Sequence, residues 1–425
     1  MKILFDRPTL YGQGEKYVVT EGGVITYIGG ARPEGTFDRV ISGKNRIMLP
    51  GLYNTHTHAA MTLFRGYGEE LPLDRWLNEK IFPAEERLTD ERVYIASQLA
   101  CAEMIANGVI SCSDMYFFCD NTVRAIGESG MKANISRSIV SFDPKADPEK
   151  DQRVIEAQKL YENYHNSCGG RIKIDMAIHA EYTNQAHFCR YLADWAKERD
   201  TLIHIHLSET SKEHDECVAR HGMTPAEWFC ECGVFDVPAL AAHCVYLTDS
   251  DISLLAEKGV SAAHNPASNL KLGSGVMRLP AMLGAGVNVT LGTDGTASNN
   301  TLDILKEMYL AAVLHKGVER RADIVGADAV IRMATENGAK AQRRDNCGQL
   351  REGFAADIIL ISTDDVNMIP MYDPAYAVVY AASSKNVALT MCAGEVLYEN
   401  GEYTKLDIEK IKRDMRSCCE NYFRD

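Results

Sequence analysis

The sequence lacks a basic surplus, a long apolar run and an apolar leader. Its 45 Lys and Arg residues face 59 Asp and Glu residues, giving a net charge of −14. Without positive charge to displace the counterions of a polyanion, nucleic acid is not an expected partner. No apolar run reaches the ~20 residues that a membrane helix needs. The apolar run after Met1 is too short for a secretory signal, so we expect neither membrane insertion nor export.

The cysteines lack the spacing of a disulfide framework or a zinc ribbon. There are 13 of them, an odd number scattered along the chain, and no C-x-x-C pair occurs. Cys418 and Cys419 are adjacent, and Cys230-x-Cys232 is interpreted as a coincidence at a helix end. Reduced thiols and a cytoplasmic location are therefore predicted.

The composition, 46% hydrophobic and 24% charged, is that of an ordinary globular protein. At 425 residues the chain exceeds the size of one simple core, so one large domain with an accessory domain is expected. Residues 1–48 contain short β-branched and aromatic runs separated by Gly22-Gly23 and Gly29-Gly30. No long helix fits there, and a small β unit is predicted.

Residues 49–347 alternate strand-like runs with segments of helical period. Eight such runs occur: Ile47 to His58, Val109 to Met115, Lys132 to Val140, Ile172 to His179, Leu202 to Leu207, Ala239 to Val245, Val260 to His264 and Val287 to Leu291. Eightfold alternation predicts an α/β fold, a (β/α)₈ TIM barrel. The alternative, a doubly wound open sheet, would need a glycine-rich turn after its first strand, where this chain has His56-x-His58.

Three helices have predictable ends. Glu91 to Asn107 is amphipathic, and Gly108 is placed to end it. Thr248 to Asp251 predicts a capping box for a helix that Gly259 closes. Asn300 is predicted to cap the next helix, with Asp303 in its first turn.

Strand signals return in residues 348–425. The runs are Ala356 to Ile361, Ala377 to Tyr380, Val387 to Met391 and Glu395 to Tyr398, with a turn at Asn400-Gly401. We expect these strands to join residues 1–48 in one small β-sandwich, so that the barrel is an insertion between its halves. The last segment, Ile408 to Phe423, is predicted to be an amphipathic docking helix.

Histidines gather at the predicted strand ends. Of the twelve in the chain, seven lie at or beside such an end: His56, His58, His179, His204, His206, His243 and His264. Because the active site of a (β/α)₈ barrel lies at the carboxyl ends of its strands, these residues are expected to lie on one rim.

The strongest candidate metal ligands are His56 and His58 after the first strand, His206 after the fifth and Asp294 after the eighth. Alternate side chains of a strand share a face, so His56 and His58 point the same way. Three imidazoles and a carboxylate suit Zn²⁺ and also accept Fe²⁺. No lysine stands at the exit of the fourth strand to bridge a second ion, which favours a single metal.

This donor set predicts metal-assisted hydrolysis, in which Asp294 accepts a proton of the activated water. Glu209, three residues beyond His206, is positioned to act as a proton donor. The residues alone leave amide, ester, phosphate and amine substrates open. Zinc deaminases that flip a base out of the stack need H-x-E followed by P-C-x-x-C, and no proline of this chain precedes a cysteine.

Several motifs together resemble the amidohydrolase superfamily, and within it the 5′-methylthioadenosine/S-adenosylhomocysteine deaminases. They are Pro50 to His58, His204 to Thr210, Ala242 to Val245, His264 to Leu272, Gly292 to Gly295 and Gly353 to Asp357, with similar stretches at 59–66 and 71–77. The resemblance covers nearly the whole chain. It implies a zinc-dependent aminohydrolase whose metal-bound hydroxide attacks C6 of an adenosine-type nucleoside, giving an inosine-type product and ammonia.

The resemblance also implies roles for individual residues. Glu209 would protonate the ring nitrogen, Asp294 would shuttle the water proton, and His243 would hydrogen-bond the oxygen at the reacting carbon. Substrate contacts would come from His179 to the purine or ribose, Glu85 to the ribose hydroxyls and Arg137 to the 5′ substituent.

One departure concerns the 5′ end of the substrate. Relatives that accept S-adenosylhomocysteine carry a second arginine about a dozen residues after the one matching Arg137, and here none occurs before Arg153. Neutral 5′ groups, as in methylthioadenosine, 5′-deoxyadenosine or adenosine, are therefore plausible.

Two alternatives stay open. One is a deaminase of guanine, a pterin or a triazine, and the other is a non-catalytic barrel homologue. A homo-oligomer is the default expectation for such an enzyme.

Overall fold

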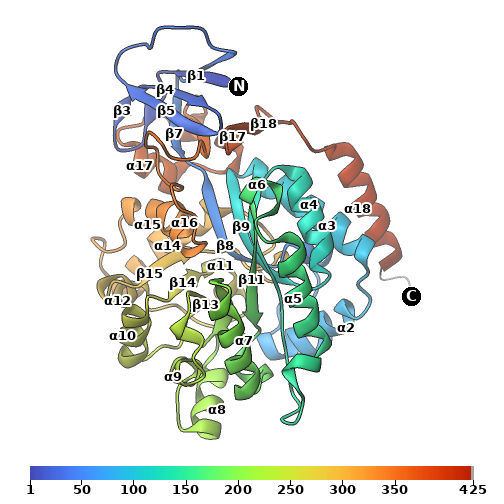
Figure 1. The fold of residues 1–425 in the computed structure, drawn as a ribbon. Helices are drawn as coiled ribbons and strands as arrows, with labels where there is room; N and C mark the ends of the chain where they lie inside the picture. Colours follow the sequence, from blue (N-terminus) through green and yellow to red (C-terminus); the bar gives the residue numbers. More distant parts are fainter. Residues whose placement is uncertain (423–425) are drawn as a thin grey trace.

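Eight parallel strands form one sheet that curls into a barrel, with helices outside it (Figure 1). The structure, a computed structural model, describes residues 1–422. The barrel strands are β8 (Leu52–Thr57), β9 (Val109–Tyr116), β10 (Lys132–Arg137), β11 (Ile172–Ile178), β12 (Ile203–Leu207), β13 (Ala239–His243), β14 (Ser261–His264) and β15 (Asn288–Leu291). Each strand pairs in parallel with the next along the chain, which confirms the predicted (β/α)₈ barrel.

The barrel closes where β15 meets β8. The Thr55 hydroxyl donates to the Leu291 carbonyl (2.8 Å), and the Asp294 N–H donates to the His56 carbonyl (2.9 Å). A Cβ at Gly292 would lie 2.8 Å from the His56 Cβ and 2.4 Å from the Asn265 Oδ1. Only glycine therefore permits the close approach that brings the end of β15 against His56.

Helices return the chain between successive strands. They are α3 (Asp90–Ala106), α4 (Cys119–Ser129), α5 (Gln152–Tyr164), α7 (Ala186–Glu198), α8 (Ser211–His221), α9 (Pro225–Glu231), α10 (Asp249–Lys258), α11 (Pro266–Lys271), α12 (Leu279–Gly284), α13 (Thr296–Asn299) and α14 (Ile304–Glu319), followed by α15 (Ala327–Ala334) and α16 (Glu336–Ala341).

The predicted helix ends were correct in two cases and wrong in one. α3 stops just before Gly108, and α10 has the capping box at Thr248 and Asp251 with Gly259 at its C-cap. Asn300, in contrast, does not cap α14. It lies at the end of α13 with φ +74°, and the Asp303 carboxylate accepts the N–H groups of α14 instead. Asn and Asp both cap helices, so the residue type alone does not predict which of the two caps α14.

Strands from both ends of the chain build two further sheets above the barrel in Figure 1. One has the order β5-β4-β1-β6 and is wholly N-terminal. The other, β19-β18-β17-β16-β7-β2-β3, joins the two termini. Their bounds are β1 (Lys2–Asp6), β2 (Thr9–Leu10), β3 (Gly14–Glu15), β4 (Tyr17–Glu21), β5 (Val24–Gly29), β6 (Arg39–Ser42), β7 (Arg46–Pro50), β16 (Ile358–Ser362), β17 (Val387–Cys392), β18 (Glu395–Glu399) and β19 (Glu402–Tyr403).

The two sheets share a small core of their own. It includes Phe5 and Ile25 from the first sheet and Met48, Leu360 and Leu389 from the second. Apolar side chains from both termini thus bury one another, and this β domain holds the two ends of the barrel segment together.

Two predicted strands differ in the structure. The run Ile47 to His58 is divided at Gly51: β7 pairs with β16 in the β domain, and β8 opens the barrel. A Cβ at Gly51 would meet Ile110 at 2.5 Å, so the glycine lets the chain pass closely between the domains. Ala377 to Tyr380 is not a strand but part of a π-helical segment, η7 (Ala377–Ala381).

The physical reason for the second error lies in the preceding residues. Asp373 caps the short helix α17 (Pro374–Tyr376), and η7 continues it. Val378 and Val379 are fully buried where η7 packs beside α14, so tertiary contact overrides their β propensity.

The C-terminal helix α18 (Ile408–Tyr422) lies along α3 at the side of the barrel (Figure 1). Its buried Ile411, Met415 and Tyr422 form the docking face. Phe423, where the predicted helix ended, lies outside the described residues. Within residues 1–422, no helix combines the length and apolar character that a membrane crossing requires.

Candidate metal centre and substrate pocket

Five residues with potential ligand atoms converge at the carboxyl end of the barrel. One atom each of His56, His58 and His206 lie within 4.8 Å of one another, and the same holds for His56, His243 and Asp294. The Asp294 Oδ1 is 3.2 Å from the His58 Nε2 and 3.6 Å from the His56 Nε2. β8, β12 and the turn after β15 thus bring together the residues predicted as metal ligands.

The His56 Nε2 atom is buried and has no hydrogen-bond partner. An orphaned imidazole nitrogen in a fully buried ring is costly unless something binds it. Surrounded by two more imidazoles and a carboxylate, it fits a divalent cation of the Zn²⁺ type.

Neighbouring groups orient the imidazoles. The Nδ1–H of His58 donates to the Met115 carbonyl (2.5 Å), and that of His206 donates to the His179 carbonyl (2.7 Å). His56 Nδ1 shares a hydrogen bond of 2.9 Å with the Nε2 of His204, a histidine not predicted to support the site. Occupying Nδ1 in this way leaves each Nε2 free as a ligand.

Electrostatics keep most of these rings neutral. Burial, reinforced by the neighbouring histidines, holds the pKa of His56 and of His206 well below its usual range. Burial lowers the pKa of His58 as well, but its contact with Asp294 outweighs this and raises the pKa to about 9. Burial alone would raise the pKa of Asp294, yet hydrogen bonding to His58 and the histidine charges lower it strongly. Asp294 is therefore a carboxylate, as a ligand must be.

The two oxygens of Asp294 have different surroundings. Oδ2 accepts hydrogen bonds from the hydroxyls of Ser268 (2.6 Å) and Ser298 (2.9 Å). Oδ1 accepts the Gly295 N–H (2.7 Å) and faces the imidazoles. The serines thus fix the rotation of the carboxylate and aim one oxygen at the cluster.

Strained backbone surrounds the cluster. Four non-glycine residues just at or after strand ends have left-handed φ values: Ser208 (+48°), His243 (+74°), Cys244 (+49°) and Asp294 (+61°). Such conformations are costly for residues with a Cβ and accumulate where function requires a side chain to be aimed.

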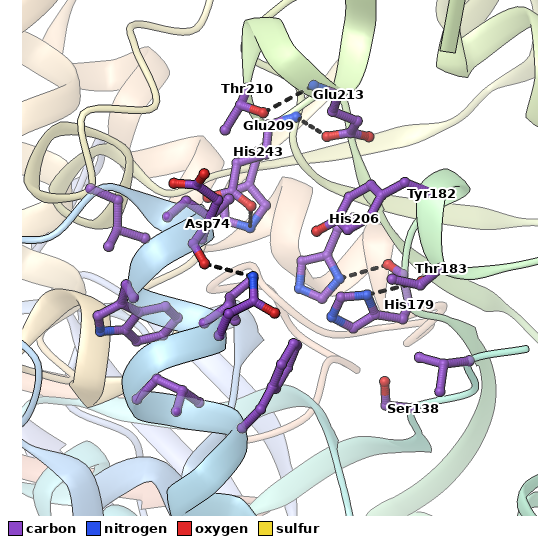
Figure 2. Close-up of a pocket in the computed structure, with 18 of the residues that line it drawn as sticks. Asp74, Ser138, His179, Tyr182, Thr183, His206, Glu209, Thr210, Glu213 and His243 are labelled. Atoms are coloured by element: carbon purple, nitrogen blue, oxygen red, sulfur yellow. Dashed lines mark hydrogen bonds and ion pairs between the residues drawn. The ribbon is translucent and has the colours of Figure 1, made fainter. Parts of the chain in front are cut away.

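Glu209 and His243 lie together beside the cluster (Figure 2). Glu209 Oε2 is 3.7 Å from the His243 Nε2, and its Oε1 accepts the Ser274 hydroxyl (3.2 Å). His243 Nδ1–H donates to the Asn269 Oδ1 (2.8 Å), which sets the ring. Burial raises the pKa of Glu209, which favours the protonated carboxyl more than in an exposed glutamate.

The cluster forms the floor of a cavity of about 730 Å³. Its apolar walls include Trp76, Leu77, Ile81 and Phe82, from α1 (Leu73–Trp76), η2 (Leu77–Ile81) and α2 (Phe82–Glu85). His179 and Tyr182 line the opposite side in Figure 2. Burial lowers the pKa of His179 to about 4, so its ring is neutral. A concave, largely apolar space with a few convergent polar groups is typical of a small-molecule site.

Glu85 also lines this cavity and accepts the hydroxyl of Tyr116 (2.6 Å). Burial raises its pKa to about 7, although the Tyr116 bond and His58 oppose the shift. The contact of Tyr116 with Glu85 was not predicted, because nothing in the local sequence distinguishes Tyr116 from a core tyrosine.

Two arginines line the same cavity. Arg137 pairs with Glu156 (2.9 Å) and lies over the Phe117 ring at 5.2 Å. Arg153, which the sequence spacing placed too far along the chain to serve, reaches the cavity too. It stands in the first turn of α5, and the loop between β10 and α5 returns it to the rim; its guanidinium donates to the Val140 carbonyl (3.0 Å).

Two strand-end groups lie elsewhere. His264 pairs with His315 (Nε2 to Nε2, 3.2 Å) and belongs to neither ligand group. Glu181, two residues after His179, pairs with Arg220 and His221 and does not line the cavity.

Comparison with known proteins agrees with this arrangement. The model of the amidohydrolase family matches residues 47–397. The chain is 41% identical to a 5-methylthioadenosine/S-adenosylhomocysteine deaminase of Acetivibrio thermocellus, over 91% of this chain and 89% of that protein. It is 40% identical to a 5′-deoxyadenosine deaminase of Methanothermobacter thermautotrophicus, over 92% and 91%. A solved adenosine deaminase from Xanthomonas campestris with bound zinc superimposes with a TM-score of 0.93 at 30% identity, covering 99% and 98% of the two chains.

Proposed function

This chain belongs to the amidohydrolase family, and we propose that it is a hydrolytic deaminase of an adenosine-type nucleoside. Water replaces the 6-amino group, giving the inosine-type product and ammonia. The observation that carries the proposal is the convergence of His56, His58, His206 and Asp294 beside a cavity that all of them except His56 line, with the buried acid Glu209 next to them. The similar proteins with deaminase names support the choice of reaction.

His56, His58, His206 and Asp294 would hold one divalent cation, Zn²⁺ being the best match to their donor atoms. A cation bound there lowers the pKa of water towards ~7 and so supplies the nucleophile at neutral pH. The zinc in the Xanthomonas campestris structure supports the choice of metal. At the exit of β11 stands His179, not a lysine, which supports a single ion.

The proton transfers are assigned to two carboxyl groups. Asp294 receives the water proton on Oδ1, the oxygen that faces the cluster while Ser268 and Ser298 hold Oδ2. Glu209, whose protonated form burial favours, gives its proton to the purine ring nitrogen next to the reacting carbon. After the C6–O bond has formed, the C6–N bond breaks: the amino group takes the proton that Asp294 received from water and leaves as ammonia, and the proton on the new C6 oxygen returns to Glu209. His243 would hydrogen-bond, through Nε2, the oxygen that develops charge at C6.

The nucleoside is oriented by groups further from the metal. Glu85 would accept the ribose hydroxyls, with Tyr116 holding its carboxyl in place. His179, neutral because of burial, would contact the purine or the ribose. The presence of Glu85 and Arg137 in the cavity, in addition to the acid Glu209, favours a nucleoside over a free base.

Arg137 and Arg153 would meet the 5′ substituent. Both residues line the cavity, so a 5′ tail ending in a carboxylate would find cationic side chains there, in competition with Glu156 for Arg137 and Asp151 for Arg153. Arg137→Ala should raise KM about tenfold for S-adenosylhomocysteine and less than about twofold for adenosine. An equal rise for both substrates would refute this role.

The decisive experiment is a steady-state assay of the zinc-loaded protein on adenosine, methylthioadenosine, 5′-deoxyadenosine, S-adenosylhomocysteine and guanine. Deamination is followed at the adenine absorption band and by ammonia release. We expect turnover of the nucleosides and none of guanine. Activity on a free base alone would refute the proposal, and a protein that stays metal-free after zinc supplementation would indicate a non-catalytic homologue.

A further inference from the structure

Three helices on the outside of the barrel begin with the same pattern, a threonine followed three residues later by an acid. The pairs are Thr210 and Glu213 in α8, Thr224 and Glu227 in α9, and Thr248 and Asp251 in α10. In each, the threonine hydroxyl accepts the N–H of the acid, at 3.1 to 3.2 Å. By sequence the three are equivalent capping boxes.

In two of the three, the acid completes the box. The Thr224 N–H donates to Glu227 Oε2 (2.8 Å), and the Thr248 N–H donates to Asp251 Oδ2 (2.8 Å). The carboxylate thus binds the N–H of its own capping residue and satisfies the helix start.

Glu213 instead binds backbone groups that precede its capping residue, Thr210. Its Oε1 accepts the N–H of Ser208 (2.9 Å), and its Oε2 accepts the N–H of Glu209 (2.8 Å). Figure 2 shows the Glu213 carboxylate reaching the backbone of Glu209 while its own N–H meets Thr210. Both oxygens therefore accept hydrogen bonds from the two residues between β12 and the helix cap, Ser208 and Glu209.

The segment that Glu213 binds is strained. Ser208 has a φ of +48°, and its carbonyl accepts the N–H groups of Val245 (3.1 Å) and Tyr246 (2.9 Å). Ser208 is thus fastened through its N–H on one side and its carbonyl on the other. Because Glu209 follows directly, this clamp sets the direction in which the Glu209 side chain leaves the backbone.

A simple helix cap would not require this arrangement. Glu227 performs its capping role while exposed, whereas Glu213 is only 5% exposed and lines the cavity. Within the described residues, no ion pair involves it. Burial raises the pKa of Glu213 to about 8, so the fold keeps an acid here against a marked energetic cost.

We propose that Glu213 is a positioning residue for Glu209: its two oxygens hold the Ser208–Glu209 backbone so that the Glu209 carboxyl faces the reacting purine. The inference rests on the proposed deaminase function for its kinetic consequence. The expected structural change, a shift of the Ser208–Glu209 segment, does not depend on the proposed function.

The first test compares Glu213→Gln with Glu227→Gln in the zinc-loaded enzyme. A glutamine at 227 still offers the one acceptor that the Thr224 N–H needs. A glutamine at 213 offers one acceptor and one donor to two N–H groups, so one of them is repelled. We expect Glu213→Gln to lower kcat about 10- to 100-fold with KM and zinc content within about twofold of wild type. Glu227→Gln should leave kcat unchanged.

A double-mutant cycle then separates positioning from general damage. If Glu213 acts through Glu209, Glu213→Gln should change kcat less than about twofold in the Glu209→Gln background. Multiplicative losses, an unchanged kcat in the single variant, or loss of zinc from Glu213→Gln would each overturn the inference.

A crystal structure of zinc-loaded Glu213→Gln provides a readout without activity. The expected result is a shifted Ser208–Glu209 segment and loss of the bond between Glu209 and Ser274, with His206 in place. Unchanged geometry would overturn the inference even if no nucleoside were deaminated, whereas a wild-type protein without deaminase activity would refute only the proposed function.

Discussion

The two ends of the barrel are both polar and buried, but they differ in how their polar groups are satisfied. At the amino end, a cavity of about 290 Å³ is lined by residues that include Asn134, Asp175 and Gln342. Asn134 donates to Asp175 (2.8 Å), Arg344 donates to the Oδ1 of Asn134 (3.0 Å), and Gln342 donates to Ser113 (3.0 Å). Donors there meet acceptors in a connected network.

At the carboxyl end, like groups face one another. Ligand atoms of several imidazoles and of Asp294 lie close together, His56 Nε2 has no hydrogen-bond partner, and Glu209 is a buried carboxyl group beside them. A satisfied hydrogen-bond network stabilises the fold. Polar atoms that lie close together and lack a protein partner instead form a site for a ligand. The contrast makes separable predictions: changes at the carboxyl end should affect activity, and changes at the amino end should affect stability.

The largest effect is expected for His56→Ala. Loss of a central ligand should remove zinc and lower kcat/KM by at least about 10³-fold, about 4 kcal/mol. Because the change lies outside the amino-end network, the far-ultraviolet circular dichroism should be that of the wild type. Zinc content and steady-state rates check this, and retained zinc with full activity would contradict the ligand assignment.

Arg344→Ala should produce the opposite result. Arg344 is 7% exposed and its guanidinium also donates to the Arg171 carbonyl (2.9 Å), so its loss leaves several buried acceptors unpaired. We expect a loss of about 3 kcal/mol in the free energy of unfolding. Denaturant unfolding measures this loss, and kcat per folded molecule should be unchanged. A fall in kcat with unchanged stability would contradict the division between the two ends.

Glu209→Gln should lower kcat by about 10²-fold or more, about 3 kcal/mol, because the amide cannot donate the required proton to the ring nitrogen. Zinc should remain bound, since Glu209 is not a proposed ligand. If zinc content fell in parallel with kcat, Glu209 would be a ligand and its assignment as the acid would be wrong.

A smaller, pH-dependent effect is expected at Asp175. Burial raises its pKa to about 6, so the folded state binds its proton more tightly than the unfolded state does. Its contribution to stability is therefore most favourable below pH ~4 and is lost as the pH rises through ~6. Asp175→Asn should match wild type near pH 4 and be more stable by about 2–3 kcal/mol near pH 7. A difference in urea midpoint that does not vary with pH would contradict this.

Local patterns predicted most elements but not their partners. The eight barrel runs were recognisable because each is short, apolar and bounded by turn residues. The division of Ile47 to His58 between two sheets was missed, because β7 and β8 differ only in which distant strand each one pairs with. The helical state of Ala377 to Tyr380 was missed because burial beside α14 decided it.

The residues of the candidate site also fall into those that the sequence predicted and those that it did not. His56, His58, His206, Glu209 and Asp294 were predictable because each lies at or just beyond the end of a strand, and parallel strands end on one rim. Arg153 was discounted on spacing, but a loop brings it back to the cavity. Glu213 could not be distinguished from Glu227, because both have the same local pattern and differ only in the amides they reach.

The sequence by itself determined the barrel and the chemical type of its donors, since strand period and strand-end residues are properties of neighbours in the chain. Only the tertiary structure decided which donors meet. The close contact of Gly292 with His56 brings Asp294 to the cluster, while His264 pairs with His315 instead. Those outcomes depend on how strands far apart in sequence pack together, and no local pattern encodes the distance between them.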